Sequence, residues 1–375
     1  MVEFVRLILL LGFFLHGEAI ADTSDGNLKS LRKTQEITYE YWLKNIADHT
    51  PPDWVEKDKK ANWRPPLNTV TVGAHINSIH GLSHKLQAFE ANVDFWATWK
   101  GKVKLWDGSE VKNPTSKFYF NSIRSFDMYQ DVGADEDVYE TEIGSSTDIN
   151  VDGSFSSKFD YKRFPFDDQT LTLDLTIGND AYEFQIISAG PPTVQTNYNK
   201  IMDYRVNEIS LVNLINYFPT NFGVPDYAKG EYFANSGVRL LIKMERFFLN
   251  SFVDYIIPMF VISLLLLINQ SRLTTDKGVK LALPPAALLS LIFLKEGADN
   301  TLPALNYLTY LDMLYLGSFF LIMLCFIEAT IFKFVDGLSI EQTRKVNQCR
   351  AMLVISTWGI FLFWPVAAWL IITML

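Results

Sequence analysis

The stretch MERFFLNSFVDYIIPMFVISLLLLINQ, residues 244–270, marks the point at which this chain of 375 residues changes character. Residues 22–247 hold most of the charged side chains, and residues 248–375 are strongly apolar. This shift predicts two domains, of which the second lies in a bilayer. The net charge of -9 argues against a nucleic-acid partner, because phosphate backbones select surfaces rich in Lys and Arg.

Four apolar segments follow one another in the second part of the chain. They cover residues 252–268, about 281–294, 305–332 and 351–375. Three of them reach the range of roughly 17–25 residues that a membrane-spanning helix needs. The second is shorter and contains Pro284, Pro285 and Ser290, which suits a helix that is shielded by neighbours and faces water on one side. We therefore expect a four-helix transmembrane bundle over residues 248–375.

Charged residues predict the orientation of these helices. The first and third connections are basic, with Arg272, Lys277 and Lys280 in the first and Lys333, Arg344, Lys345 and Arg350 in the third. The second connection sets Lys295 against Glu296 and Asp299. By the positive-inside rule, the first and third connections face the cytoplasm. The chain is thus expected to be a multi-pass protein of the cell (plasma or inner) membrane, with its N-terminal domain extracytoplasmic.

The N-terminus independently predicts export. Arg6 precedes an apolar run, residues 7–15, that is too short to span a bilayer. The sequence Ala19-Ile20-Ala21 then has the small-x-small pattern of a cleavage site. We interpret residues 1–21 as a signal peptide, and a membrane anchor is the alternative interpretation.

Two patterns follow the signal peptide. Residues 22–66 form an N-terminal extension, in which apolar side chains near a 3.6-residue period predict an amphipathic helix over residues 24–48. In residues 67–247, short runs rich in β-branched and aromatic residues alternate with turn clusters such as Val151-Asp152-Gly153. This spacing is typical of an antiparallel β-sandwich. The only cysteines, Cys325 and Cys349, lie in or beside apolar segments, so the sandwich has no disulfide framework.

Several short motifs occur in an order that resembles one family. Residues 161–167 read YKRFPFD, Arg246 precedes Pro258 by twelve residues, residues 276–283 read DKGVKLAL, and Leu302-Pro303 follows. Over residues 67–375 the chain resembles the pentameric ligand-gated ion channels, the Cys-loop receptor superfamily. Ser157 and Leu171 stand where animal members carry the loop cysteines. The resemblance is therefore to the prokaryotic branch, which lacks that disulfide.

The resemblance implies a homopentamer of identical subunits that conducts inorganic ions, expected to be cations, across a lipid membrane. The agonist would be a small molecule or protons. Residues implied in coupling the domains are Phe164, Pro165, Phe166, Asp167, Arg246, Leu302 and Pro303. Because a partly buried Arg demands a carboxylate, Asp167 is the expected partner of Arg246. The rival interpretation is a membrane-tethered binding or signalling receptor that does not conduct.

The second apolar segment carries the candidate pore face. Its pore-lining candidates are spaced by 4, 3, 4 and 3 residues, which is one face of a helix: Ala282, Ala286, Leu289, Phe293 and Glu296. Five-fold symmetry would turn Leu289 and Phe293 into hydrophobic gating rings and Glu296 into an outer carboxylate ring. Packing against neighbouring helices is the plain alternative for the two apolar residues.

Selectivity and the start of this helix are separate expectations. Val279 replaces the carboxylate that cation-selective relatives carry next to the position of Lys280, and Asp276 is a candidate substitute. Glu296 and an acidic outer domain still favour cations, although weakly. We expect the helix to begin at Pro284-Pro285, with residues 280–283 irregular, because prolines remove backbone donors and clash with the preceding turn.

The resemblance places agonists between subunits, under a hairpin at about residues 217–233. The ligand-binding candidates are Asp94, Trp96, Asp127, Phe222, Tyr227 and Tyr232. Gly178 stands where a cage aromatic is usual, so the site is more acidic and less caged than that of an amine receptor. Ordinary packing of a chain with 14% aromatic residues is the alternative.

Enzymatic function is not expected. The sequence has no nucleophile motif, phosphate-binding loop or metal-spaced His/Cys cluster, and its five histidines are scattered. We therefore predict neither a cofactor nor a metal. Residues 131–142 hold six carboxylates, which indicates a solvated loop, a divalent-ion site or a pH-sensitive cluster.

Overall fold

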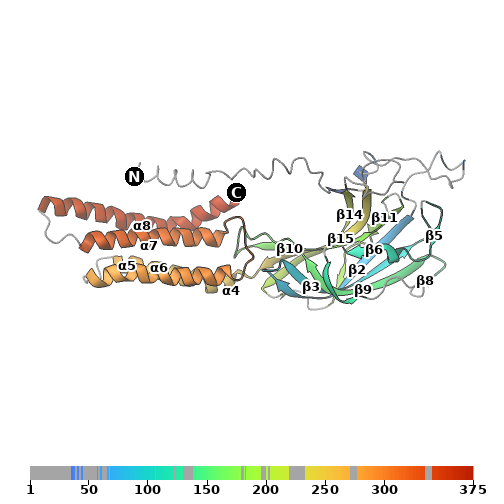
Figure 1. The fold of residues 1–375 in the computed structure, drawn as a ribbon, viewed down its shortest axis with the longest axis horizontal. Coiled ribbons are helices and arrows are strands. Elements are labelled where there is room, and N and C mark those ends of the chain that lie inside the picture. The colour runs from blue at the N-terminus through green and yellow to red at the C-terminus, as the bar shows by residue number, and fades with distance from the viewer. Residues whose placement is uncertain are drawn as a thin grey trace.

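The chain folds into a β-rich domain followed by four long helices (Figure 1). The computed structural model describes residues 35–38, 40–41, 44, 57, 60, 66, 68–105, 107–120, 123–129, 138–178, 181, 183–195, 200–201, 203–218, 233–270, 277–333 and 340–374. The two parts lie end to end, so the molecule is elongated (Figure 1). The predicted fold class, a β-sandwich followed by a four-helix bundle, is confirmed.

Two sheets make up the β domain. The first has the order β1 (Gln35–Ile37), β14 (Tyr204–Phe218), β15 (Phe233–Arg246), β10 (Asp168–Ile177) and β6 (Phe118–Phe120), with β13 (Lys200–Ile201) paired to β14. The second has the order β11 (Phe184–Ser188), β2 (Asn68–Ser83), β3 (Ala88–Trp99), β9 (Ser145–Ser156) and β7 (Ile123–Tyr129), with β12 (Thr193–Val194) on β2 and β8 (Tyr139–Glu140) on β9. Strands β4 (Val103–Lys104) and β5 (Glu110–Val111) form a separate pair. The pairing is antiparallel, except that β11 and β12 lie parallel to β2.

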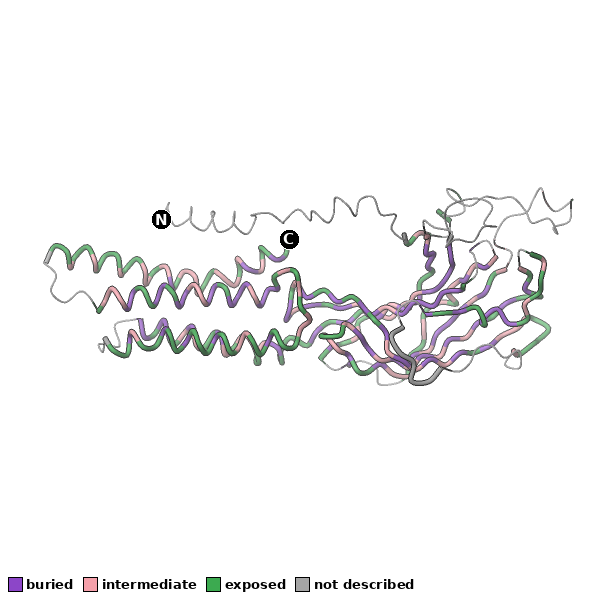
Figure 2. Tube along the Cα trace, in the orientation of Figure 1, coloured by how far each residue is buried: buried purple, intermediate pink, exposed green. Residues whose placement is uncertain are grey.

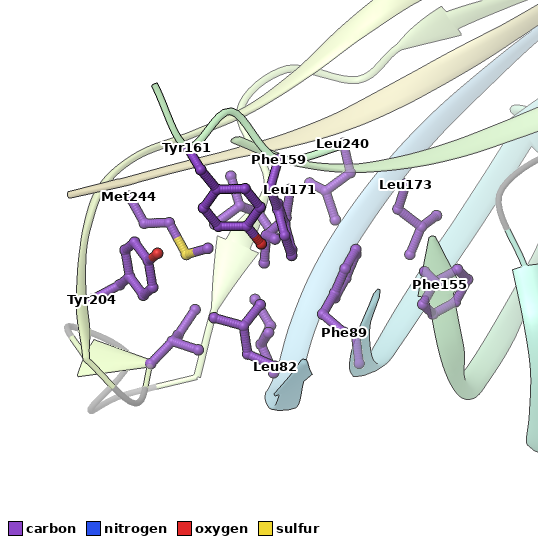
Figure 3. Close-up of a cluster of buried hydrophobic side chains, with 14 of the residues drawn as sticks. Leu82, Phe89, Phe155, Phe159, Tyr161, Leu171, Leu173, Tyr204, Leu240 and Met244 are labelled. Carbon is purple, nitrogen blue, oxygen red and sulfur yellow. The ribbon is translucent and has the colours of Figure 1, made fainter. Parts of the chain in front are cut away.

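Alternating burial explains why these segments form strands. Along β3, buried residues such as Ala91, Val93 and Phe95 alternate with half-buried ones. This period of two puts one face of the sheet in the core and the other at the surface. The core fills the space between the sheets, where Phe89 and Phe155 face Leu173 and Leu240 (Figure 3).

Within the residues that the structure describes, four helices are long and apolar enough to cross a membrane: Phe248–Gln270, Gly278–Asp299, Tyr310–Lys333 and Glu341–Met374. The first comprises α4 (Phe248–Ser251), a π-helical turn (Phe252–Ile256) and α5 (Ile257–Gln270). The others belong to α6 (Lys277–Asp299), α7 (Tyr310–Lys333) and α8 (Ile340–Met374). Helix α7 is the most buried of the four, whereas α8 is largely exposed (Figure 2). A multi-pass membrane protein is therefore supported.

Two expectations about local structure were wrong. Helix α6 begins at Lys277 and continues through Pro284 and Pro285. A proline's fixed φ suits a helix, and membrane helices tolerate the lost donor where neighbouring helices surround it. Residues Gln35–Ile37 form strand β1 within the predicted 24–48 helix, because the edge of β14 offers backbone partners that periodicity does not reveal. Glu40, Tyr41 and Lys44 are helical, and the remainder of 24–48 lies outside the described residues.

Candidate functional site

A buried ion pair lies where the β domain meets the helices. Arg246, the last residue of β15, donates from Nε to Oδ1 of Asp167 at 2.7 Å and from Nη2 to Oδ2 at 3.2 Å. The exposed fractions of the two side chains are only 4% and 1%. Tyr204 also donates to Asp167, at 3.0 Å, and its ring lies 4.5 Å from the guanidinium carbon. The expected pair is thus present, and both carboxylate oxygens of Asp167 accept hydrogen bonds, as the burial of two charges requires.

His84 joins this cluster, although the sequence analysis set it aside. It begins the turn between β2 and β3, and its Nε2 lies 3.5 Å from Nη2 of Arg246. Burial, reinforced by the charge of Arg246, lowers the pKa of His84 to about 4. The imidazole is therefore neutral at physiological pH. No local signal identifies this residue, because its charged neighbour is 162 positions away in sequence.

The loop of residues 161–167 sits directly on the first turn of α7. The backbone N–H groups of Tyr310 and Leu311 donate to the carbonyls of Lys162 and Phe164 at 2.8 and 3.1 Å. Phe166 packs against the rings of Tyr310 and Trp369, with centroids 5.9 and 6.0 Å apart. A helix N-terminus has unsatisfied donors, and this loop supplies the acceptors. The β domain and the helical domain are therefore joined by backbone hydrogen bonds as well as by packing.

These contacts involve residues further along the chain than Leu302 and Pro303, which the resemblance implied in coupling the domains. Phe164 and Thr301 line one cavity of about 460 Å³, while the hydrogen bonds go to α7. Leu302 and Pro303 line a second cavity, of about 680 Å³, between the end of α6 and the start of α7. The free N–H groups of a helix start attract the loop carbonyls more strongly than an irregular loop does.

The base of the 161–167 loop is closed without a disulfide. The hydroxyl of Ser157 donates to the carbonyl of Thr170 at 3.1 Å and accepts from the N–H of Thr172 at 3.3 Å. The Phe164–Pro165 peptide bond within the loop is cis. A serine thus stands at the predicted cysteine position and fixes the loop base to β10 by hydrogen bonds.

Helices α6 and α7 are tied together at the end next to the β domain. Thr309 and Asp312 form a reciprocal cap at the start of α7, with the Asp312 N–H 3.1 Å from Oγ1 of Thr309 and the Thr309 N–H 2.9 Å from Oδ2 of Asp312. Lys295 of α6 donates to Asp312 at 2.8 Å and to Asp299 at 2.8 Å. The start of α7 is therefore tied to α6 by an ion pair.

The five pore-lining candidates share an exposed face of α6. Ala282, Ala286, Leu289, Phe293 and Glu296 are all exposed in the isolated chain. Leu289 is 55% and Phe293 is 63% exposed. The opposite face, with Ala287 and Leu291, packs against the bundle. Exposure also extends to Leu288, so the free arc of α6 is wider than the predicted line. Asp276 lies outside the described residues.

A second buried charge cluster, which the sequence analysis missed, lies at the other end of the bundle. Glu328 of α7, 1% exposed, accepts from Nε and Nη2 of Arg350 of α8 at 3.0 and 2.7 Å. Arg350 and Lys280 of α6 both lie over the ring of Phe332, at 4.2 and 4.9 Å. Three helices thus share this cluster. An acidic residue within an apolar segment was the available signal, since such residues normally have a partner or a role.

The ligand-binding candidates are only partly described. Asp94 and Trp96 lie on the same face of β3, where Asp94 accepts hydrogen bonds from Asn77, at 2.7 Å, and from Asn150. The indole of Trp96 covers Gly73, where any side chain would overlap it. Asp127 lies in β7, which β9 separates from β3, and its side chain is outside the description. Phe222, Tyr227 and Tyr232 are outside the described residues.

The divalent-ion interpretation of residues 131–142, one of the alternatives for this acidic stretch, stays a prediction. In the part of the chain that the structure describes, no group of three His, Cys, Asp or Glu side chains could hold a metal ion. Of residues 131–142, the structure describes only 138–142, and Glu140 and Glu142 are exposed. Residues 131–137 lie outside the description.

We call the contacts where the β domain meets the helices the junction. The fold and the junction together define a class of protein: a β-sandwich domain joined to a four-helix membrane bundle, an architecture compatible with the pentameric channel fold. Comparison of the sequence with protein-family models gave no match, and no curated protein matches it either.

Proposed function

We propose that this chain is one subunit of a homopentameric ion channel of the cell membrane, opened by a small ligand or by protons and weakly selective for cations. The β domain lies outside the cell, as the basic first and third connections and the signal-like N-terminus indicate. Neither an enzymatic activity nor a nucleic-acid partner belongs to this proposal.

The observation that carries the proposal is the uncovered face of α6. This helix is long enough to span a membrane, yet its exposed face includes the carboxylate of Glu296 and the small residues Ala282 and Ala286. Ionisable residues in membrane segments normally face protein or a water-filled cavity. Five copies arranged around an axis would place this face on a central pore, with Leu289 and Phe293 as hydrophobic constrictions.

The junction supports a gated channel. Agonist binding in the β domain would shift the 161–167 loop, whose carbonyls are bonded to the start of α7. The Lys295–Asp312 contact then passes the movement to α6. The buried pair of Arg246 and Asp167 holds the end of β15 against the loop during this movement. Chains of packed and hydrogen-bonded elements of this kind carry energetic coupling between domains.

For the agonist, we propose a small cation or protons. Asp94 and Trp96 supply a carboxylate and an aromatic face on β3, and the hairpin that carries Phe222, Tyr227 and Tyr232 supplies further aromatic residues. Such a combination attracts positive charge.

Current recording tests the proposal directly. Purified protein would be reconstituted in a planar bilayer and exposed to a pH series and to a panel of small amines. We expect discrete openings that depend on one of these stimuli and that, in a salt gradient, reverse at a potential shifted from zero toward the cation equilibrium potential. Saturable binding of a stimulus without any current would instead support the receptor that does not conduct.

A further inference from the structure

The short strand β1 occupies a specific place on the β domain. It pairs antiparallel with the end of β14, with Gln35 opposite Tyr217, Glu36 opposite Asn216 and Ile37 opposite Ile215. Strand β14 then leads, through residues that lie outside the description, into β15, with which it forms a long hairpin. Segment 35–37, here called the strap, therefore covers the β14 edge immediately before the hairpin tip.

The edge of β14 is a surface that accepts added strands. Within the described residues, it carries β13 at its membrane end and the strap at the hairpin end. An edge strand presents unpaired N–H and C=O groups, and an extended segment binds there through its backbone. Backbone pairing over three residues is a small contact, so the strap needs a further anchor to stay in place.

That anchor is a charged side-chain contact across three strands. Arg239 of β15 donates from Nη1 and Nη2 to the two carboxylate oxygens of Glu36, at 2.7 and 2.6 Å. It also donates from Nε and Nη2 to Asp174, its direct register partner on β10, at 2.6 Å each. Paired bonds of this kind are strong and geometrically specific. Glu36 is the exposed and replaceable member, at 54%, while Asp174 keeps Arg239 in position.

We propose that residues 35–37 form a releasable strap, bound to the β14 edge by strand addition and locked by Glu36 on Arg239, which restrains the β14–β15 hairpin. This inference rests on the proposed function, in which the hairpin frames the agonist site. The occupant of the edge is the chain's own N-terminal extension. Release of the strap frees the hairpin and so changes the agonist concentration needed for opening.

Hydrogen–deuterium exchange of the full-length protein tests the strap itself. In Glu36→Ala, peptides covering residues 212–218 should exchange at least about threefold faster, because their edge partner is lost more often. The matched control is Glu110→Ala, which removes an exposed ion pair, Lys102–Glu110 at 2.9 Å, on a separate two-stranded sheet. Unchanged exchange in Glu36→Ala, or equal acceleration in both variants, overturns the proposal.

Peptide complementation tests strand addition. A variant lacking residues 22–44 should show the same fast exchange at 212–218, and a synthetic peptide of those residues, added in excess, should slow it again. The same peptide with Glu36→Ala should fail to do so. Equal protection by both peptides would overturn the lock, and protection by neither would overturn strand addition.

Currents separate this inference from the proposed function. Acid steps, and the amine that opens the parent channel in the screen, should show a half-maximal concentration shifted at least about threefold in Glu36→Ala but not in Glu110→Ala. Faster exchange without such a shift overturns the regulatory role. Absence of any current in the parent protein overturns the channel, while the exchange experiment still decides the strap.

Discussion

At the scale of single residues, the junction depends on charged side chains that are buried away from water. Arg246 and Asp167 are almost completely buried and partner each other, and Asp167 also accepts hydrogen bonds from Tyr204 and Gln169. Burial, and then the charge of Asp167, raises the pKa of the Tyr204 phenol, so that hydroxyl remains a hydrogen-bond donor. Removal of one charge from such a set is costlier than removal of both.

Arg246→Ala should abolish or strongly impair gating. It leaves the Asp167 carboxylate buried without its cation, which costs about 3–5 kcal/mol. The measurement is the peak current per assembled channel, and size-exclusion chromatography checks that assembly is intact. The matched variant Arg246→Ala with Asp167→Asn should regain part of the lost stability. Normal agonist responses in Arg246→Ala would refute the coupling role.

His84 should make the β domain less stable in acid. Its pKa is about 4 in the folded chain against an ordinary 6.5, because burial and Arg246 disfavour the cation, although Asp167 and Asp203 partly offset them. Between these two pH values, His84 is protonated in the unfolded chain but neutral in the folded chain. The free energy of unfolding therefore falls as the pH falls, by about 3 kcal/mol in all. Above pH 6.5 this contribution is constant.

Urea denaturation between pH 7 and pH 4 measures this slope. The free energy of unfolding of His84→Gln should change less with pH than that of the parent over that window, because glutamine does not take up a proton. His80→Gln is the control, since His80 is exposed and lies 3.4 Å from Glu90. Parallel curves for the parent and His84→Gln would show that His84 is not held neutral by its surroundings.

At the scale of elements, the two faces of α6 differ in burial more than in polarity. One face, with Ala287 and Leu291, packs on the bundle, and the other is free. The helix passes through Pro284 and Pro285 without ending, although two adjacent prolines would stop an isolated helix in water. Its surroundings, and not its own propensity, therefore set its length.

Leu289→Ser should make the channel easier to open. A ring of hydroxyls hydrates a constriction that leucine keeps dry. The expected result is a lower half-maximal agonist concentration, or openings without agonist, in single-channel recordings. Leu288→Ser is the matched control, because Leu288 is also exposed, at 38%, but lies off the predicted pore line. An equal effect of both variants would place the gate elsewhere.

At the scale of the whole molecule, the isolated chain leaves large apolar surfaces uncovered. Helix α8 is mostly exposed, as suits a lipid-facing helix, and α6 is exposed along a face that holds Glu296 (Figure 2). Only one of these two faces is compatible with lipid. In the proposed channel, further subunits and water would cover the other face.

We predict that the chain assembles as a homopentamer. A lone subunit would turn Glu296 toward lipid, which a bilayer penalises. Native mass spectrometry in mild detergent should show five copies as the main species. A monomer or dimer as the largest species would contradict the predicted assembly.

Weak cation selectivity should be controlled at the outer mouth. Five Glu296 carboxylates on a ring of nanometre scale lie about one Debye length apart at physiological salt, so their fields overlap. Glu296→Gln should therefore reduce inward cation current and move the reversal potential in a salt gradient toward zero. Asp276→Asn is the competing variant at the cytoplasmic mouth. A shift in Asp276→Asn alone would place the filter there, and a parent that prefers chloride would refute cation selectivity.

The order of the domains and the number of spans could be predicted because hydropathy and periodicity are local properties. Runs of apolar residues, the alternation along strands such as β3, and the basic connections all appear within short windows. The pairing of Asp167 with Arg246 could be predicted because a buried Arg needs a carboxylate, and the order of the motifs offered one candidate for that carboxylate.

The tertiary structure alone decided the partners of His84, Glu328 and Glu36. His84 lies beside Arg246, Glu328 beside Arg350, and Glu36 beside Arg239, at separations of 162, 22 and 203 positions. The packing of the folded chain determines which groups lie beside a buried charge, and no local sequence pattern indicates those partners. The same reason explains the loop seated on α7, the strand formed by residues 35–37 and the uninterrupted α6, since each depends on donors, acceptors or neighbours supplied by remote parts of the chain.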